Sequence, residues 1–124
     1  MTLLLDTHVF LWWSMGSRKL KTQARRAIAG ADDVYVSAAS AWEAAVKIAL
    51  GRLTMDVAFE EAVRASEFRQ LPVSFGHAAA AGLLPPYHAD PFDRMLIAQS
   101  QVEGFAVVTH DPLFDAYDIR IVRA

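Results

Sequence analysis

Short, almost wholly apolar runs recur along the chain, separated by longer stretches in which apolar and polar residues mix. Apolar runs of this length are typical of buried strands. They lie at residues 2–5 (TLLL), 34–36 (VYV), 71–74 (LPVS), 105–109 (FAVVT) and 119–122 (IRIV). Strands without a polar face indicate a parallel sheet that is covered by helices on both sides.

The stretches between these runs have the apolar spacing of helices. The predicted helices cover residues 7–14, 18–30, 37–51, 56–68, 76–84 and 91–104. The buried stripe expected of the alanine-rich helix 37–51 consists of Trp42, Val46, Ala49 and Leu50. Because strands and helices alternate, we expect a three-layer α/β/α domain with a central parallel sheet of four to five short strands. Ligands of such sheets bind beyond the carboxyl ends of the strands.

Length and composition limit the class of protein. A chain of 124 residues with 54% hydrophobic residues is expected to form one domain, residues 1–124, with a substantial core. The absence of cysteine excludes disulfides and cysteine-ligated zinc. No apolar stretch approaches the roughly 18 residues of a membrane span, and Asp6 and His8 interrupt the apolar start. We therefore expect a cytoplasmic protein without a membrane partner.

The charge balance argues mildly against a nucleic-acid binder, because the net charge is −2. The charges are nevertheless uneven: the segment from Arg18 to Arg26 carries five positive residues and no acid. A solvated helix face is the simpler interpretation of this cluster.

Two aspartates directly follow predicted strands. Asp6 ends the strand at 2–5, and Asp111 follows the strand at 105–109 and precedes Pro112. Each can cap the next helix, which is the role expected of an aspartate before a helix-starting proline. Each also lies where a parallel sheet binds its ligands.

Glu43 lies one turn into the helix 37–51 and admits three interpretations. It forms a capping-box pattern with Ser40 and a helical i,i+4 pair with Lys47. It also lines up with Val46 and Leu50, so it borders the predicted buried stripe.

The segment HADPFDR (88–94) places two aspartates around a proline at the start of an apolar helix. Asp90 before Pro91 is best interpreted as a helix cap, and contact with a metal is the alternative. Asp93 shares a helix face with Leu96 and Ile97 and should point inward. The helix dipole stabilises a first-turn carboxylate by about 0.3–1 kcal/mol, whereas burying an unpaired charge costs several times more. An inward Asp93 therefore needs a cation.

The acids Asp6, Glu43, Asp93 and Asp111 are all expected at the same rim of the sheet. Two carboxylates about 4 Å apart repel by roughly 4 kcal/mol at an effective dielectric near 20. Such a group requires protonation or a metal. Ligands that are all oxygen favour Mg²⁺, with Mn²⁺ as the alternative.

These motifs carry a family resemblance. The segments LLLDTHVFLWW, SAASAWEAAVKIALGRL, HADPFDRMLIAQSQVEGFAVVTHD and LFDAYDIRIV resemble a PIN-domain ribonuclease of the VapC toxin type, from type II toxin–antitoxin systems. They are spread over nearly the whole chain, and residues 54–87 match least. Ala89 departs from the basic residue expected in H-x-D-P-F-D, which would weaken a phosphate contact and leave the metal site intact.

The resemblance implies a metal-dependent endoribonuclease. Its four acids fall on Asp6, Glu43, Asp93 and Asp111. Thr7 and Thr109 match the small hydroxyl residues that flank the first and last acids, and we expect both to contact the substrate. One or two Mg²⁺ ions are expected to activate water for in-line attack on an RNA phosphodiester. The resemblance further implies a cognate antitoxin, which inserts an apolar helix to block the site, and a toxin homodimer.

RNA phosphates need cations, because contacts with the nucleic-acid backbone dominate affinity. Arg94, Lys47 and Arg52 lie near the predicted rim and are the expected partners. Trp12 and Trp13 can stack on bases, although packing is the simpler role for both.

Two other classes of function share some of these features. A phosphoacceptor signalling domain also gathers acids around Mg²⁺, but it would carry paired acids after the first strand and a lysine after a late one. Here Asp6 precedes Thr7 and His8, and Lys47 is the last lysine. The other alternative is a PIN-fold binding module without catalysis, against which the presence of all four acids argues.

Overall fold

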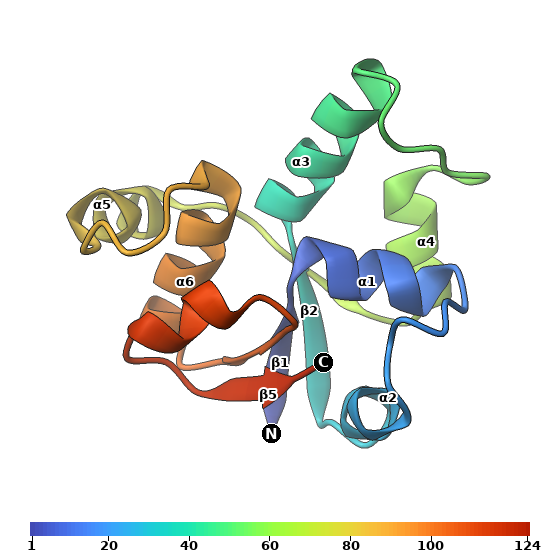
Figure 1. Ribbon diagram of the computed structural model, residues 1–124, viewed down its shortest axis with the longest axis horizontal. Helices are drawn as coiled ribbons and strands as arrows, with labels where there is room; N and C mark the ends of the chain where they lie inside the picture. Colours follow the sequence, from blue (N-terminus) through green and yellow to red (C-terminus); the bar gives the residue numbers. More distant parts are fainter.

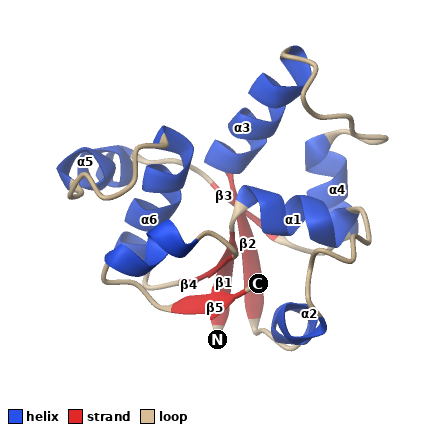
Figure 2. Cartoon of the chain, in the orientation of Figure 1, coloured by secondary structure: helices blue, strands red, loops and turns tan.

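The computed structural model describes residues 1–124 and contains one parallel sheet of five strands. The strands are β1 (Thr2–Leu5), β2 (Asp33–Ser37), β3 (Arg69–Leu71), β4 (Ala106–Thr109) and β5 (Ile121–Arg123). Their order across the sheet is β3–β2–β1–β4–β5, and all four pairings are parallel. The chain therefore starts in β1, in the middle of the sheet (Figure 1), and β4 returns from far along the sequence to pair with β1 (Figure 2).

Six α-helices and one 3₁₀ helix connect the strands. They are α1 (Thr7–Ser14), α2 (Thr22–Ala29), α3 (Ala38–Ala49), α4 (Phe59–Ala65), α5 (Phe75–Leu83), α6 (Pro91–Glu103) and η1 (Pro112–Ala116). Every predicted helix is present, although α2 begins four residues after the expected start at residue 18. None of the helices combines the length and the apolar character that crossing a membrane requires.

The two faces of the sheet hold two separate cores. On one face, Leu3, Leu5 and Val36 pack with apolar residues of α1, α2 and α4. On the other, Leu4 and Val107 pack with residues of α6 and η1. Successive strand residues point to opposite faces, so an uninterrupted apolar run supplies both cores. The sheet lies between these helices in Figure 2, which confirms the predicted α/β/α layers.

The third strand begins two residues earlier than predicted. The sequence indicated residues 71–74, whereas β3 covers Arg69–Leu71. Pro72 has no backbone N–H to donate to a ladder, so the strand ends before it. Ser74 instead caps α5 in a reciprocal capping box with His77.

The predicted buried stripe of α3 was wrong. Trp42 and Leu50 are 64% and 61% exposed, and the buried face carries small and polar residues. These are Ala39, Ser40, Glu43 and Ala44. The reason is that α3 packs against α1 and α6 beyond the carboxyl ends of the strands, rather than flat on the sheet (Figure 2).

Candidate functional site

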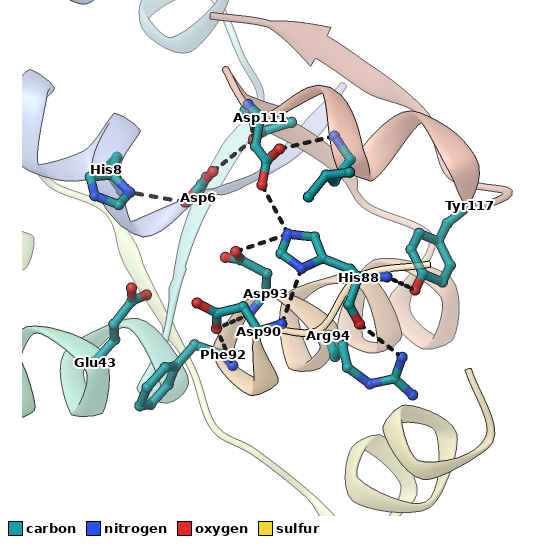
Figure 3. Close-up of polar contacts among 12 residues, drawn as sticks. Asp6, His8, Glu43, His88, Asp90, Phe92, Asp93, Arg94, Asp111 and Tyr117 are labelled. Carbon is teal, nitrogen blue, oxygen red and sulfur yellow. Dashed lines mark hydrogen bonds and ion pairs between the residues drawn. The ribbon is translucent and has the colours of Figure 1, made fainter. Parts of the chain in front are cut away.

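The four predicted acids come from four elements and meet beyond the carboxyl ends of β1 and β4. Asp6 follows β1, Glu43 lies on α3, Asp93 is in the first turn of α6, and Asp111 follows β4. Their carboxylates face a common space in Figure 3. Asp6 and Glu43 are only 5% and 4% exposed. Charges that lie 105 positions apart along the chain are thereby concentrated in one place.

Asp6 is held by both its backbone and its side chain. Its N–H donates to the Val108 carbonyl at 3.0 Å, which continues the β1–β4 ladder. Its carboxylate accepts from Thr109 Oγ1 at 2.7 Å and, more weakly, from the His8 N–H at 3.4 Å. Burial raises the pKa of Asp6, and the nearby Glu43 adds to this effect, while the Thr109 hydrogen bond opposes it. Asp6 is therefore both the cap of α1 and an acid of the site.

Only one of the two carboxylate oxygens of Glu43 has a hydrogen-bond partner. Lys47 Nζ lies 2.9 Å from Oε2, so the predicted i,i+4 pair is present. Oε1 is buried without a hydrogen-bond partner. A buried carboxylate oxygen without a donor is costly unless a cation approaches it. Figure 3 shows this carboxylate directed toward the other acids.

Asp93 carries the strongest electrostatic signal of the site. Burial raises its pKa to about 8, and repulsion from the carboxylates of Asp6, Asp90, Glu43 and Asp111 adds to the shift. The ordinary value for an aspartate is near 3.9. The site thus disfavours the charged form of Asp93 at neutral pH unless positive charge is supplied.

The two carboxylate oxygens of Asp111 make different contacts. Oδ1 accepts from the Leu113 N–H at 2.9 Å and caps η1. Oδ2 lies 2.9 Å from His88 Nε2 and faces the site. The Asp111 N–H also donates to Thr109 Oγ1 at 3.0 Å. Capping and membership of the acid cluster are therefore compatible.

His88 is the site residue that sequence reasoning missed. Its buried ring lies between two acids, with Nε2 2.9 Å from Asp111 Oδ2 and 3.1 Å from Asp93 Oδ2. Its Nδ1 accepts the backbone N–H of Asp90 at 3.2 Å. In the neutral ring the proton must then sit on Nε2, which donates toward the two carboxylates. The three ligand atoms lie within 4.8 Å of one another, but a protonated Nε2 is a donor and not a metal ligand. The available signal was its place two residues before the Asp90 cap.

Asp90 is the helix cap that the sequence predicted. Its Oδ1 accepts from the N–H groups of Phe92 at 2.8 Å and Asp93 at 3.3 Å. Pro91 occupies the first helical position. Because the Asp90 N–H also binds His88, this one residue orients both His88 and Asp93.

Arg94 does not point at the acids. Its guanidinium donates to four backbone carbonyls, those of Ala81, Leu84, Pro85 and His88, at 2.9–3.3 Å. These carbonyls run from the last turn of α5 to the residues before α6, and Figure 3 shows the guanidinium at the His88 carbonyl. The side chain therefore braces this connection, which favours an architectural role over the expected phosphate contact.

The two threonines expected to meet substrate are fully buried. Thr7 Oγ1 donates to Ser40 Oγ at 2.8 Å and links α1 to α3. Thr109 joins Asp6 to the backbone of Asp111. Both hold the acids in place. The remaining predicted contacts, Lys47 and Arg52, line a pocket beside the acids.

The sequence model of the PIN domain matches residues 3–120, nearly the whole chain and all four acids. The chain belongs to the PIN domain family. Ribonuclease VapC22 of Mycobacterium tuberculosis (strain ATCC 25618 / H37Rv) is 33% identical to this PIN domain over 113 residues, which cover 89% of this chain and 87% of that protein. The resemblance to VapC-type PIN ribonucleases is thereby confirmed.

Solved structures share the fold of this PIN domain. VapBC2 from Rickettsia felis, bound to a promoter DNA fragment, superposes with a TM-score of 0.73 at 12% identity and covers 99% of this chain and 98% of the other. VapC20 of Mycobacterium tuberculosis, described as a sarcin-ricin loop cleaving toxin, gives a TM-score of 0.63 at 20% identity, with coverage of 98% and 99%.

Proposed function

We propose that this PIN domain is a Mg²⁺-dependent endoribonuclease toxin that hydrolyses RNA phosphodiester bonds at the four-carboxylate site. The observation that carries the proposal is the convergence of Asp6, Glu43, Asp93 and Asp111 at one end of the sheet. Burial, together with repulsion from the neighbouring carboxylates, raises the pKa of Asp93 to about 8. Carboxylates gathered in this way repel one another unless a cation neutralises them, which supports a metal site. The name of its relative, Ribonuclease VapC22, supports RNA as the substrate class.

The residues present fit a divalent cation. The buried Glu43 Oε1 lacks any partner, and the carboxylates of Asp6 and Asp111 repel that of Asp93. Carboxylate oxygens are the preferred ligands of Mg²⁺, with Mn²⁺ as the alternative. When bound, such an ion neutralises the cluster, generates a nucleophile from water at neutral pH and stabilises charge on the phosphate.

The remaining groups prepare the site for this ion. Thr109 and the backbone of Val108 fix Asp6. Lys47 holds one oxygen of Glu43 and leaves the other free. We assign His88 the task of directing the carboxylates of Asp93 and Asp111 toward the same point, through its Nε2–H. Groups that orient metal ligands in this way typically affect metal affinity or activity 10- to 100-fold.

The direct test is RNA cleavage by the purified protein with Mg²⁺, with and without EDTA. We expect structured RNA to be cut with Mg²⁺ and left intact with EDTA, and excess Mg²⁺ should restore cutting. The Asp118→Asn variant, which changes an exposed aspartate outside the site, should cut like the wild type. Cutting that persists in EDTA would contradict metal dependence. Binding of RNA without cutting would instead favour the binding-module alternative.

A second prediction concerns His88. Replacing it by alanine should lower cleavage and Mn²⁺ affinity by about 10- to 100-fold, because the two carboxylates lose their common donor. Glutamine can place an N–H near the position of Nε2, so His88→Gln should recover part of both. Calorimetric titration with Mn²⁺ measures the affinity independently of cleavage. Equal Mn²⁺ binding by the wild type and His88→Ala would rule out this role.

We also propose two protein partners for this chain, a cognate antitoxin and a second copy of the chain. An apolar groove of about 360 Å³ between α3 and α4, lined in part by Val36, Phe59 and Val63, suits the apolar helix of a cognate antitoxin. The VapBC assemblies among the structural relatives support such a partner. A homodimer is supported by exposed apolar side chains such as Phe75, which is 95% exposed. The cytoplasm is the proposed location, because RNA is the proposed target.

A further inference from the structure

A pocket beside the acids has the composition of an anion site. It has a volume of about 370 Å³ and lies between α1, the segment after it and the end of α3. Three cations line it, Lys19, Lys47 and Arg52, together with the rings of His8 and Trp12. No acid is among the lining residues. Lys47 is paired with Glu43, whereas the side chains of Lys19 and Arg52 form neither ion pairs nor hydrogen bonds within the protein.

Trp12 gives this pocket an aromatic wall. Its indole is half-buried, and its ring centroid lies 6.4 Å from that of His8 and 5.8 Å from that of His110. The ring of its neighbour Trp13 packs against Phe68, with the ring centroids 5.5 Å apart, and Arg25 lies over it. The two tryptophans therefore have different surroundings, and Trp12 is the one next to the site.

The pocket is continuous with the acid cluster through two of its own residues. The backbone N–H of His8 contacts the Asp6 carboxylate at 3.4 Å. Lys47 Nζ lies 2.9 Å from Glu43 Oε2. A strand whose phosphate reaches the acids can therefore place a neighbouring nucleotide beside the Trp12 ring. The pocket lies within the range of about 300–1,000 Å³ found for small-molecule sites, which suits one nucleotide.

We infer that this pocket holds one nucleotide of single-stranded RNA next to the bond that is cut, with its base on Trp12 and its phosphate between Lys19 and Arg52. The inference rests on the proposed endoribonuclease function and specifies how that site receives its substrate. An indole beside cations is the usual means of binding a single strand, because every base offers a face for stacking. An acidic protein segment would use the cations and leave the indole face without a partner.

The first test uses the three tryptophans as reporters. The indole N–H signals of ¹⁵N-labelled wild-type protein are recorded in EDTA while AMP, UMP or ribose 5-phosphate is added. We expect AMP and UMP to shift the Trp12 signal, and ribose 5-phosphate to shift it much less. Trp42, which is 64% exposed, controls for nonspecific stacking. Equal shifts of Trp12 and Trp42, or no shift of Trp12, would overturn the inference.

The second test measures binding of a fluorescein-labelled single-stranded RNA oligonucleotide to an Asp93→Asn background. Trp12→Ala should weaken binding by roughly 5- to 100-fold, the range of one lost stacking contact, and Trp12→Phe should recover most of it. Lys19→Ala and Arg52→Ala should each reduce the dependence of log affinity on log salt by about 0.7. Lys21→Ala makes the same change outside the pocket and should leave this salt dependence unchanged.

The outcomes separate this inference from the proposed function. If Trp12→Ala and Lys19→Ala cut RNA normally, the nucleotide-binding role of the pocket would be overturned and the proposed function would stand. RNA that is neither bound nor cut by the wild type would overturn the proposed function, and the pocket with it. A polyglutamate peptide that shifts Trp12 more strongly than AMP would assign the pocket to an acidic protein partner instead.

Discussion

Replacing Asp93 by asparagine is expected to abolish RNA cleavage, with a loss of at least about 10³-fold. A metal ion contributes several kcal/mol of charge stabilisation in the transition state, and each 1.36 kcal/mol corresponds to a tenfold change in rate. Asparagine keeps the size of the side chain but removes the charge that the ion requires. Initial rates of cleavage of a labelled RNA, with Mg²⁺ varied up to saturation, measure the effect.

The same substitution should stabilise the metal-free protein at pH 8. The wild type must there hold a half-ionised Asp93 among four other carboxylates, and the variant does not. The expected gain in the free energy of unfolding is on the order of 1–3 kcal/mol, comparable to the desolvation penalty of a buried polar group. Asp118→Asn is the matched control and should change neither cleavage nor stability. Wild-type cleavage by Asp93→Asn would remove Asp93 from the site.

The stability of the metal-free protein should fall as the pH rises from about 4 to about 8. In this interval the unfolded chain has lost the Asp93 proton, whereas the folded chain keeps it, since its pKa there is about 8. The unfolded state thus binds fewer protons, and the free energy of unfolding decreases with pH. Asp6, whose pKa burial also raises, acts in the same direction.

Mg²⁺ should oppose this loss of stability with pH. Protons compete with the ion for the carboxylates, so the stabilisation by Mg²⁺ should be larger at pH 8 than at pH 5. At about 100 times the dissociation constant it should reach roughly 2.7 kcal/mol. Urea unfolding in EDTA and in Mg²⁺ at both pH values measures the two effects. Asp93→Asn should flatten the pH dependence. Two results would contradict a metal-binding acid cluster. One is a metal-free protein that becomes more stable between pH 5 and pH 8, and the other is a stability that Mg²⁺ does not change at either pH.

Strand ends made the acid cluster predictable. Asp6 and Asp111 follow apolar runs, and the carboxyl ends of neighbouring parallel strands open on the same rim. Asp93 was predictable as well, because helical spacing aligned it with the buried Leu96 and Ile97. These inferences needed only local periodicity and the general rule for parallel sheets.

Contacts that depend on how a loop between two helices folds were not predictable from the sequence. Arg94 was expected near phosphate, because nothing in the sequence shows that the segment 81–88 turns back over it. His88 lies in the same segment, and its ring reaches the acids only because the Asp90 N–H holds Nδ1. The stripe of α3 was misjudged because apolar spacing predicts which face is apolar, but not which element the helix packs against.

The bond between Thr109 and Asp6 joins residues 103 positions apart, and it has a consequence during synthesis. The ribosome must pass residue 111 before the last acid exists and before β4 can occupy its place beside β1. A growing chain therefore lacks the last acid of the proposed site for nearly the whole of its translation. On the proposed function, a polypeptide released before residue 111 should not cut RNA.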